Sequence, residues 1–306
     1  MPLSPNLRGS LFMVVSMIGF TTNDALVKLA TEHMSFGQVM FVRGMFATVL
    51  IGLLGWYHSA FANWRDIMHP IVGLRIIGEL GATLFFLAAL SRLPLANVSA
   101  ILQALPLAVT MAAALFFGET VGWRRWLAIA AGFTGVMIIV RPGAEGFNVF
   151  ALLVLISVVF CAIRDLATKR IPDHIPSLLV SAVTAIMVTI AGAFLIIPLG
   201  GWVPMNTEAV GLNAMAAVLV VVGYQFIIMA MRVGEISAVA PFRYTALLWA
   251  IFLGYLIFGD LPDAAMIIGS IIIVGSGLYT LYRDRVVGRS KAASESTGPN
   301  MAPDGI

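Results

Sequence analysis

The sequence has little charge and almost no cysteine. Asp, Glu, Lys and Arg make up 11% of the 306 residues, whereas soluble domains average about 25%. With 60% hydrophobic residues and a mean hydropathy of +0.99, the apolar side chains cannot all be hidden in one core of this size. The single cysteine, Cys161, excludes an internal disulfide. These deficits exclude a soluble enzyme, a disordered chain, a coiled coil and a disulfide scaffold, and indicate a membrane protein.

Motifs for metal, nucleophile and nucleotide chemistry are also missing. The four histidines lack the H-x-x-x-H and H-E-x-x-H spacings of metal sites. There is no G-x-S-x-G motif and no phosphate-binding loop. The net charge of +3 includes no run of five or more basic residues. We therefore expect no enzyme activity, metal, cofactor or nucleic-acid partner. A membrane enzyme, a channel and a scaffold or sensor are the rival classes.

Apolar stretches recur along the chain at membrane-spanning length. A helix crosses the hydrocarbon core in about 20 residues. The sequence predicts ten such helices, at 10–30, 36–57, 71–90, 96–117, 123–140, 148–167, 177–199, 211–231, 236–258 and 263–282. The first is too long for a signal-peptide core and contains Asn23 and Asp24, so we expect it to be retained. The tail, 284–306, is predicted to be disordered.

The basic residues of the connecting segments predict an orientation in the bilayer. If both termini lie in the cytoplasm, these residues divide eleven to three in favour of the inside. The inner set is Arg8, Arg65, Arg124, Arg125, Lys169, Arg170, Arg232, Arg283, Arg285, Arg289 and Lys291. The outer set is Lys28, Arg92 and Arg141. We therefore predict cytoplasmic termini.

Two charged motifs recur at one spacing. Asn-Asp-x-x-x-Lys at 23–28 matches Arg-Asp-x-x-x-Lys at 164–169, and Phe-Gly-Glu at 117–119 matches Phe-Gly-Asp at 258–260. Both motifs are shifted by 141 residues (164 minus 23, and 258 minus 117). The first motif ends the first predicted helix of each half, and the second ends the fourth. The chain is therefore predicted to be an internal duplication.

Five helices per copy is an odd number, so the second copy enters the membrane from the opposite side. Inverted repeats are the architecture of secondary transporters, whose binding site lies near the midplane between the halves. The sequence thus predicts an all-α integral membrane protein with repeats at 8–141 and 148–283. A duplicated scaffold without a transport role is the alternative.

The repeat and its motifs resemble the drug/metabolite transporter superfamily with two EamA domains. The segments Ser-Pro-Asn-Leu-Arg-Gly at 4–9 and Arg-Leu-Pro-Leu-Ala-Asn-Val-Ser-Ala-Ile-Leu-Gln-Ala-Leu-Pro at 92–106 are also similar to bacterial riboflavin transporters of the RibN type. The resemblance implies two inverted five-helix EamA repeats in a bacterial inner membrane. It implies a cavity lined mainly by the first, third, fourth, sixth, eighth and ninth helices. It also implies riboflavin as the substrate.

Seven ionisable residues fall inside the predicted spans. They are Asp24, Arg43, Arg75, Glu79, Arg164, Asp165 and Arg243. A charge at the centre of a membrane helix costs about 2.5–3.5 kcal/mol. Seven in lipid would exceed the net stability of a typical fold, about 5–15 kcal/mol. They must therefore pair, reach an interface or line a wet cavity.

Depth and spacing divide these charges. Asp24 and Arg43 both lie in the outer halves of their helices, so an ion pair between them is plausible. A role in the cavity is an equally weighted alternative for both residues. We favour helix pairing for Arg75, Arg164 and Asp165, which lie near inner ends where long side chains reach the interface. We favour a cavity role for Glu79 and Arg243. Glu79 would carry the proton if transport is proton-coupled.

Polar and aromatic residues in the spans complete the candidate site. They are Asn23, Asn97, Gln103, Tyr224, Gln225, Tyr244 and Trp249. Pro106 and Pro241 are expected to interrupt their helices, and interrupted helices commonly face the site or a gate of a transporter. These groups suit a planar heteroaromatic ligand, although composition accepts an amino acid or a nucleoside equally well. Hydrogen bonding between helices is the structural alternative.

Small residues on the fifth predicted helix allow close helix contact. Ala128 and Gly132, and likewise Ala131 and Gly135, are four residues apart. We expect them to serve core packing, with a homodimer seam as the alternative. Taken together, the sequence predicts an inner-membrane carrier for riboflavin that works by alternating access. A carrier or exporter of amino acids or related metabolites is the alternative.

Overall fold

The computed structural model describes residues 4–57, 67–118, 121–142, 148–172 and 174–287. These ranges form helices without any strand. The helices are α1 (Pro5–Ala30), α2 (Phe36–Tyr57), α3 (Pro70–Leu90), α4 (Leu95–Leu102), α5 (Leu105–Phe117), α6 (Trp123–Val140), α7 (Phe150–Thr168), α8 (Ser177–Ile196), α9 (Thr207–Val233), α10 (Ile236–Val239), η2 (Ala240–Tyr244), α11 (Thr245–Phe258) and α12 (Ala264–Val287). Within the described ranges they provide ten segments long and apolar enough to cross a membrane, as predicted.

The fourth and ninth spans are interrupted where proline was expected to bend them. The fourth span divides into α4 and α5, with Pro106 in the first turn of α5. The ninth divides into α10, the 3-10 helix η2 and α11, with Pro241 in the first turn of η2. A proline in a first turn lacks only an N–H that has no helical partner there. Gln103 ends α4 and its counterpart at a shift of 141, Tyr244, ends η2, so the interruption is itself repeated.

Two glycines in equivalent positions end α5 and α11. Gly118 has φ of 66° and Gly259 has φ of 68°, in the left-handed region that glycine adopts without strain. The acidic residue that follows each glycine is part of the predicted repeat motif. Asp260 is described, whereas Glu119 lies outside the described residues. The glycine of the motif therefore stops the helix in both repeats.

The last helix extends beyond its predicted end. α12 reaches Val287, whereas the disordered tail was predicted to begin at residue 284. Residues 288–306 lie outside the described part of the chain. The boundary differs because charged residues, which signal the membrane interface, do not by themselves end a helix.

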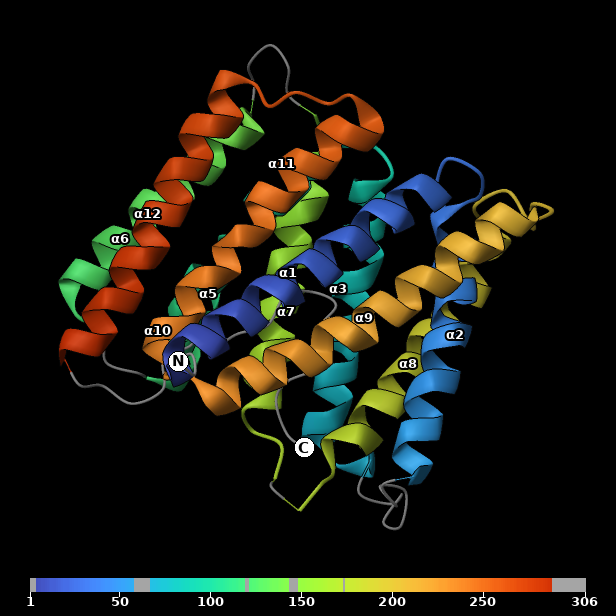
Figure 1. Cartoon of the computed structure of the whole chain (residues 1–306), viewed down its shortest axis with the longest axis horizontal. Helices are drawn as coiled ribbons and strands as arrows, with labels where there is room; N and C mark the ends of the chain where they lie inside the picture. Colours follow the sequence, from blue (N-terminus) through green and yellow to red (C-terminus); the bar gives the residue numbers. More distant parts are fainter. Residues whose placement is uncertain (1–3, 58–66, 119–120, 143–147, 173, 288–306) are drawn as a thin grey trace.

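Helices of the first repeat pack against helices of the second throughout the bundle (Figure 1). The main pairs are α1 with α9, α3 with α7, α2 with α8, and α6 with α12. In Figure 1 the α6–α12 pair lies on one side of the molecule and the α2–α8 pair on the other. The shift of 141 relates α1 to α7, α3 to α9, α2 to α8 and α6 to α12. Exchanging the two repeats therefore converts the α1–α9 pair into the α3–α7 pair, and it leaves the α2–α8 and α6–α12 pairs unchanged. The pairing therefore follows a pseudo-two-fold axis, as inverted repeats require.

Two matched hydrogen bonds reproduce this symmetry at the level of atoms. Ser16 Oγ on α1 donates to the carbonyl of Gly223 on α9 at 2.8 Å. Ser157 Oγ on α7 donates to the carbonyl of Ala82 on α3 at 2.9 Å. Both donors and both acceptors are separated by the same shift of 141 (157 minus 16, and 223 minus 82). The spacing found from charged motifs therefore also relates contacts in the interior.

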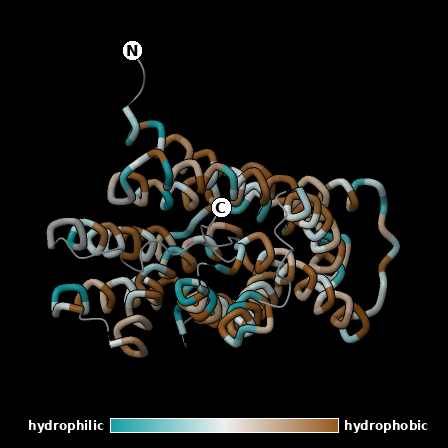
Figure 2. Tube along the Cα trace, turned by 90° about the horizontal axis from the view of Figure 1, so that it is seen from below, coloured by the Kyte–Doolittle hydropathy of each residue, from teal (hydrophilic) through white to brown (hydrophobic). Residues whose placement is uncertain are grey.

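The outer surface of the bundle is apolar. Leu53, Phe194 and Ile271 are 55%, 77% and 66% exposed. Figure 2 shows hydrophobic residues along most of the helical trace, and not just at its centre. Contiguous apolar surface on this scale requires a lipid environment.

The helices begin and finish at two opposite ends of the bundle. The Lys28 end is where α1 and α3 finish and α2 begins, and the Ser177 end is where α2 finishes and α8 begins.

Candidate functional site

A cavity lies between α2, α3, α8 and α9, so both repeats form its wall. Its empty volume is about 1120 Å³, which includes open solvent at its mouth. Its lining includes Arg43, Gly44, Ala47, Leu54, Arg75, Glu79, Thr83, Ser177, Leu178, Ser181, Thr184, Ala185, Val188, Val220, Tyr224 and Gln225.

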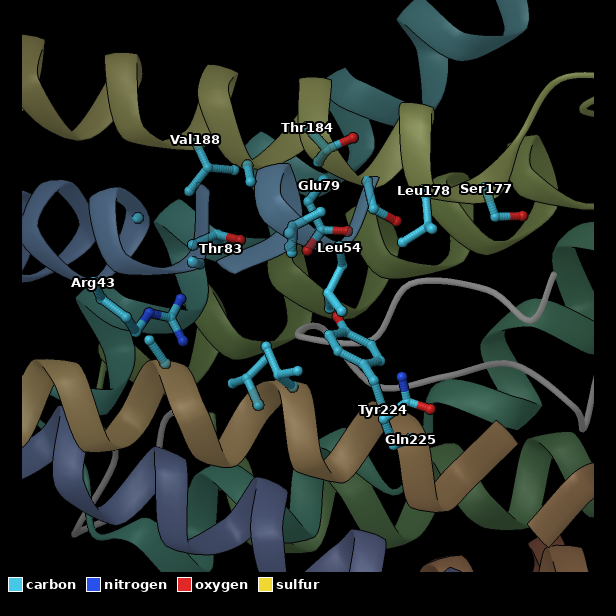
Figure 3. A pocket seen from close by; sticks show the side chains of 18 of the residues that line it. Arg43, Leu54, Glu79, Thr83, Ser177, Leu178, Thr184, Val188, Tyr224 and Gln225 are labelled. Atoms are coloured by element: carbon cyan, nitrogen blue, oxygen red, sulfur yellow. The ribbon is translucent and has the colours of Figure 1, made fainter. Parts of the chain in front are cut away.

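The cavity runs from the middle of the bundle to the Ser177 end. Arg43 lies at one end of it and Ser177 at the other (Figure 3). Ser177 and Leu178 are in the first turn of α8, so the cavity reaches the end of that helix. Toward the Lys28 end, the cavity does not extend to the helix ends within the described residues. There the buried Gln38 side chain donates to the carbonyl of Val203 at 2.7 Å and accepts from its N–H at 2.9 Å.

The cavity lies across the pseudo-two-fold axis. Five pairs of lining residues are related by the shift of 141: Arg43 and Thr184, Gly44 and Ala185, Ala47 and Val188, Glu79 and Val220, and Thr83 and Tyr224. Three of the six paired positions on α2 and α8 are small residues, Gly44, Ala47 and Ala185, which leaves room between these two helices. The repeat counterpart of each charged residue in these pairs is neutral: it is Thr184 for Arg43 and Val220 for Glu79. The cavity therefore has a polarity that the repeat alone does not produce.

Arg43 is connected to Asp24, its predicted partner, by hydrogen bonds of the Asn23 side-chain amide. Arg43 Nη1 donates to Asn23 Oδ1 at 3.4 Å, and Asn23 Nδ2 donates to Asp24 Oδ1 at 2.9 Å. Asn23 is fully buried and Arg43 is nearly so. The predicted proximity of Asp24 and Arg43 is thus found, with Asn23 between them. These two hydrogen bonds hold the guanidinium of Arg43 at the end of the cavity that lies farthest from Ser177.

Four buried charges connect α3, α7 and α8 beside the cavity. Glu79 Oε2 lies 3.9 Å from Arg75 Nη2 and 3.5 Å from Arg164 Nη1. Arg75 Nη1 donates to Thr184 Oγ1 on α8 at 2.6 Å. Arg164 Nε and Nη2 donate to Asp165 Oδ1 at 2.8 and 2.6 Å.

These contacts give each charge a partner and join the two repeats. Arg75 and Arg164 are 1% and 0% exposed, and an unpaired charge at that depth would be strongly destabilising. Arg75 thereby connects α3 to α8 and Arg164 connects α7 to α3, whereas the contact of Asp165 with Arg164 lies within α7, so helix pairing by Asp165 stays a prediction. Arg75 and Glu79 in addition line the cavity.

Tyr224 and Gln225 supply an aromatic ring and an amide to the wall formed by α9. Figure 3 shows Tyr224 pointing from α9 across the cavity toward Leu54 and Glu79. Its ring is held from behind by Phe20 in an edge-to-face contact with centroids 5.4 Å apart. The ring can therefore present a face to a ligand without having to be ordered by it.

The remaining predicted site residues do not line this cavity. Asn97 and Gln103 belong to α4 and its end, and Arg243, Tyr244 and Trp249 belong to η2 and α11. Trp249 packs edge-to-face on Phe252 with centroids 5.8 Å apart. The buried Tyr244 hydroxyl has no hydrogen-bond partner among the described residues. These residues lie on the two interrupted spans, and they stay hypotheses as ligand groups.

The helices that form the cavity also differ from those that the resemblance implied. The cavity is lined by the second, third, seventh and eighth spans (α2, α3, α8 and α9). The third and eighth were expected, whereas the first, fourth, sixth and ninth were expected but contribute no lining residue to it. The second and seventh spans enter because Gly44, Ala47 and Ala185 leave space where α2 and α8 cross.

Sequence reasoning missed the hydroxyl groups of the cavity. Ser177, Ser181 and Thr184 lie on α8, and Thr83 lies on α3. A signal was present, because Ser177, Ser181, Thr184 and Val188 follow each other at intervals of four, three and four residues. This is the spacing of one helix face. It went unused because hydroxyls in membrane helices usually bond the preceding turn, as Thr184 Oγ1 does to the Val180 carbonyl at 2.7 Å.

The small residues of the fifth span serve packing against α12. A side chain at Gly135 would meet the Gly269 carbonyl at 2.7 Å and Ile273 at 3.0 Å. At Gly132 it would meet Leu107 and Ser276. The spacing is therefore explained within the chain, and a homodimer stays a prediction.

Ten apolar spans in two inverted repeats around a cavity on the repeat axis are the architecture of a membrane transporter. The sequence model of the EamA-like transporter family matches residues 7–141 and 149–282. The chain belongs to this family, which is part of the drug/metabolite transporter superfamily.

Relatives within the family transport different compounds. The chain is 24% identical to an S-adenosylmethionine uptake transporter of Rickettsia prowazekii, over 96% of this chain and 99% of that protein. It is 27% identical to a riboflavin transporter of Vibrio cholerae, over 88% and 91%. It is 26% identical to the pseudopaline exporter CntI of Pseudomonas aeruginosa, over 87% and 93%. A crystal structure covering 91% of this chain and 98% of its own aligns with a TM-score of 0.61 at 20% identity, a likeness of fold.

Proposed function

We propose that this protein carries riboflavin into the cell by alternating access of the cavity between α2, α3, α8 and α9. The observation that supports this most directly is the position of the cavity. It lies on the repeat axis, is lined by both repeats and, among the described residues, reaches the Ser177 end alone. Rocking the repeats about that axis would close the Ser177 end and open the Lys28 end.

The chemistry of the wall supports a planar, largely uncharged ligand. Tyr224 offers a ring for stacking and Gln225 offers an amide for ring carbonyls and nitrogens. Hydroxyls of Ser177, Ser181 and Thr83 can bond a polyol chain. Riboflavin combines a heteroaromatic ring system with such a chain, and riboflavin transporters are among the relatives.

A second candidate is a carrier for a metabolite derived from an amino acid. Arg43 and Glu79 bring opposite charges to the cavity wall. They could bind the carboxylate and the ammonium group of such a substrate. The S-adenosylmethionine transporters and the pseudopaline exporter among the relatives make this the main competitor.

The positive-inside rule supports the direction of opening. Arg8, Lys169, Arg170 and Arg232 lie toward the Ser177 end, and Lys28, Arg92 and Arg141 toward the Lys28 end. With the more basic end in the cytoplasm, the protein is an inner-membrane carrier with both termini inside. The cavity then opens to the cytoplasm.

Uptake of labelled riboflavin tests the proposal. The protein would be expressed in a bacterial strain that can neither make nor import riboflavin, at limiting external vitamin. We expect growth rescue and entry of label that unlabelled riboflavin competes and S-adenosylmethionine does not. An Arg43→Lys/Glu79→Gln variant and quantification of the protein in membranes serve as controls. Absence of uptake by protein present in the membrane contradicts the substrate. Competition by S-adenosylmethionine supports the second candidate.

A further inference from the structure

A lysine at the end of α1 joins three helix ends at the closed side of the bundle. Lys28 Nζ donates to the carbonyls of Leu90 and Leu93 at 3.2 and 2.6 Å, just where α3 ends. The same ammonium lies 5.2 Å from the ring centroid of Phe258, the last residue of α11. We call Lys28, these two carbonyls and the Phe258 ring the Lys28 latch. It joins the first repeat, through α1 and α3, to the second, through α11.

The physical basis of the latch is the charge of a helix end. The last carbonyls of a helix lack helical partners and carry partial negative charge, so a cation stabilises them. Phe258 adds a cation–π contact from the other repeat. The half-buried ammonium thus favours the arrangement in which the Lys28 end is closed.

The other repeat carries the same set of groups at the open end. The counterparts at a shift of 141 are Lys169 for Lys28, Met231 and Gly234 for Leu90 and Leu93, and Phe117 for Phe258. Here the set is not assembled. Lys169 is exposed, and Phe117, 40% exposed, is covered by the guanidinium of Arg170 at 3.9 Å from its centroid.

We propose that the two lysines are alternating latches of the transport cycle. In the present state Lys28 closes its end while Lys169 is released into solvent. In the opposite state Lys169 binds the carbonyls of Met231 and Gly234 over Phe117, and Lys28 is released. The proposal rests on the carrier mechanism above but not on the identity of the substrate. Inverted repeats exchange conformations when the cavity changes sides, so the groups that close one end should have working counterparts at the other.

The test measures which side of the membrane reaches the cavity. Val188 lines the cavity, and Cys161 is buried, so a Cys161→Ala/Val188→Cys chain places one reporter thiol on the wall. The full chain is reconstituted in proteoliposomes of known orientation. A membrane-impermeant maleimide is then applied to each face, without substrate. Lys28→Met, Lys169→Met and the double variant are compared with the reporter chain. Glu208→Gln at the Lys28 end and Arg124→Met at the Ser177 end each remove an exposed charge as controls.

We expect the two single variants to change the rate of labelling from the Lys28 face in opposite directions. Losing hydrogen bonds from a charged group shifts such an equilibrium by about tenfold. Lys28→Met should therefore raise labelling from the Lys28 face about tenfold, and Lys169→Met should lower it about tenfold. The double variant should return near the parent rate, and the controls should stay there.

Two results would overturn the latches. One is unchanged labelling in Lys28→Met, and the other is a shift of the same sign in both single variants. The Lys169→Met arm decides the matter if Lys28→Met fails to fold, because Lys169 is exposed. If no variant is ever labelled from the Lys28 face, the carrier mechanism fails together with the latches. If the signs are opposite but riboflavin is not taken up, the latches stand and the substrate is wrong.

Discussion

The hydroxyls of Thr48 and Thr189 lie 3.2 Å apart, and the two residues are separated by 141 positions. They are therefore repeat counterparts that contact each other, which places them on the pseudo-two-fold axis. Thr48 is near the middle of α2 and Thr189 near the middle of α8. The axis thus crosses the bundle at mid-depth, next to the cavity residues Ala47 and Val188. The symmetry axis and the cavity therefore meet at the mid-depth of the bundle.

Removing either of the matched serine hydroxyls should have the same small effect. Ser16→Ala and Ser157→Ala each delete one hydrogen bond to a carbonyl that keeps its place in a helix. Such bonds between membrane helices contribute about 0.6 kcal/mol on average. Unfolding in mixed detergent micelles, followed by circular dichroism, should give losses of about this size for both variants. A loss of several kcal/mol in just one of them would contradict equivalent packing of the repeats.

Gly192 should tolerate no side chain, whereas Gly52 should. A Cβ at Gly192 would lie 2.5 Å from the backbone nitrogen and 2.9 Å from the Cα of Phe41, so α2 and α8 would have to separate. We expect Gly192→Ala to reduce the free energy of unfolding by about 1–3 kcal/mol. A Cβ at Gly52 meets nothing within 4 Å, and Gly52→Ala should be neutral or stabilise the helix by about 0.5–1 kcal/mol. Equal melting temperatures for the two variants in detergent would refute this packing.

The buried charge cluster predicts a partial rescue. Arg164→Leu leaves Asp165 buried without the guanidinium that binds it, which should cost about 3–5 kcal/mol. Adding Asp165→Leu removes the stranded charge and should recover part of the loss. Arg124→Leu, at an exposed position, should stay within about 0.5 kcal/mol of the parent. The measurement is the unfolded fraction against detergent composition. A double variant no more stable than Arg164→Leu would show that the pair is not coupled.

The spans and the repeat could be predicted from the sequence because membrane crossing constrains length, apolarity and charge in every helix. Two motifs were enough to find the shift of 141, and proline predicted both interruptions. The end of α12 was predicted too early in the chain: the disordered tail was expected from residue 284, but the charged last turn of the helix continues to Val287.

The cavity could be predicted only in part. Lipid and protein interior are equally apolar, so hydrophobicity does not tell which face of a membrane helix looks inward. Arg43, Glu79, Tyr224 and Gln225 were found as unusual residues in their spans. The wall formed by α8 is made of small and hydroxyl residues, and nothing unusual marks Ala185 or Ser181 singly.

Tyr224 should contribute to substrate affinity more than its neighbour. Tyr224→Leu removes the ring from the cavity wall, and loss of one aromatic contact corresponds to about 0.5–1.5 kcal/mol. We therefore expect the KM of riboflavin uptake to rise by about three- to tenfold. Phe226 follows on the same helix and packs on Phe12 with centroids 5.8 Å apart, away from the cavity lining. Phe226→Leu should leave KM unchanged. A larger effect of Phe226→Leu would place the substrate elsewhere.

Protection of a cavity thiol by riboflavin tests the central claim most directly. In proteoliposomes, the rate of maleimide labelling of Cys161→Ala/Val188→Cys would be measured against riboflavin concentration, with Cys161→Ala/Glu235→Cys as an exposed control at the same end. The account predicts that riboflavin slows labelling of the cavity thiol alone, with half protection at the KM of uptake. Unchanged labelling at riboflavin concentrations that saturate uptake would contradict it, because the transported compound would then not pass through this cavity.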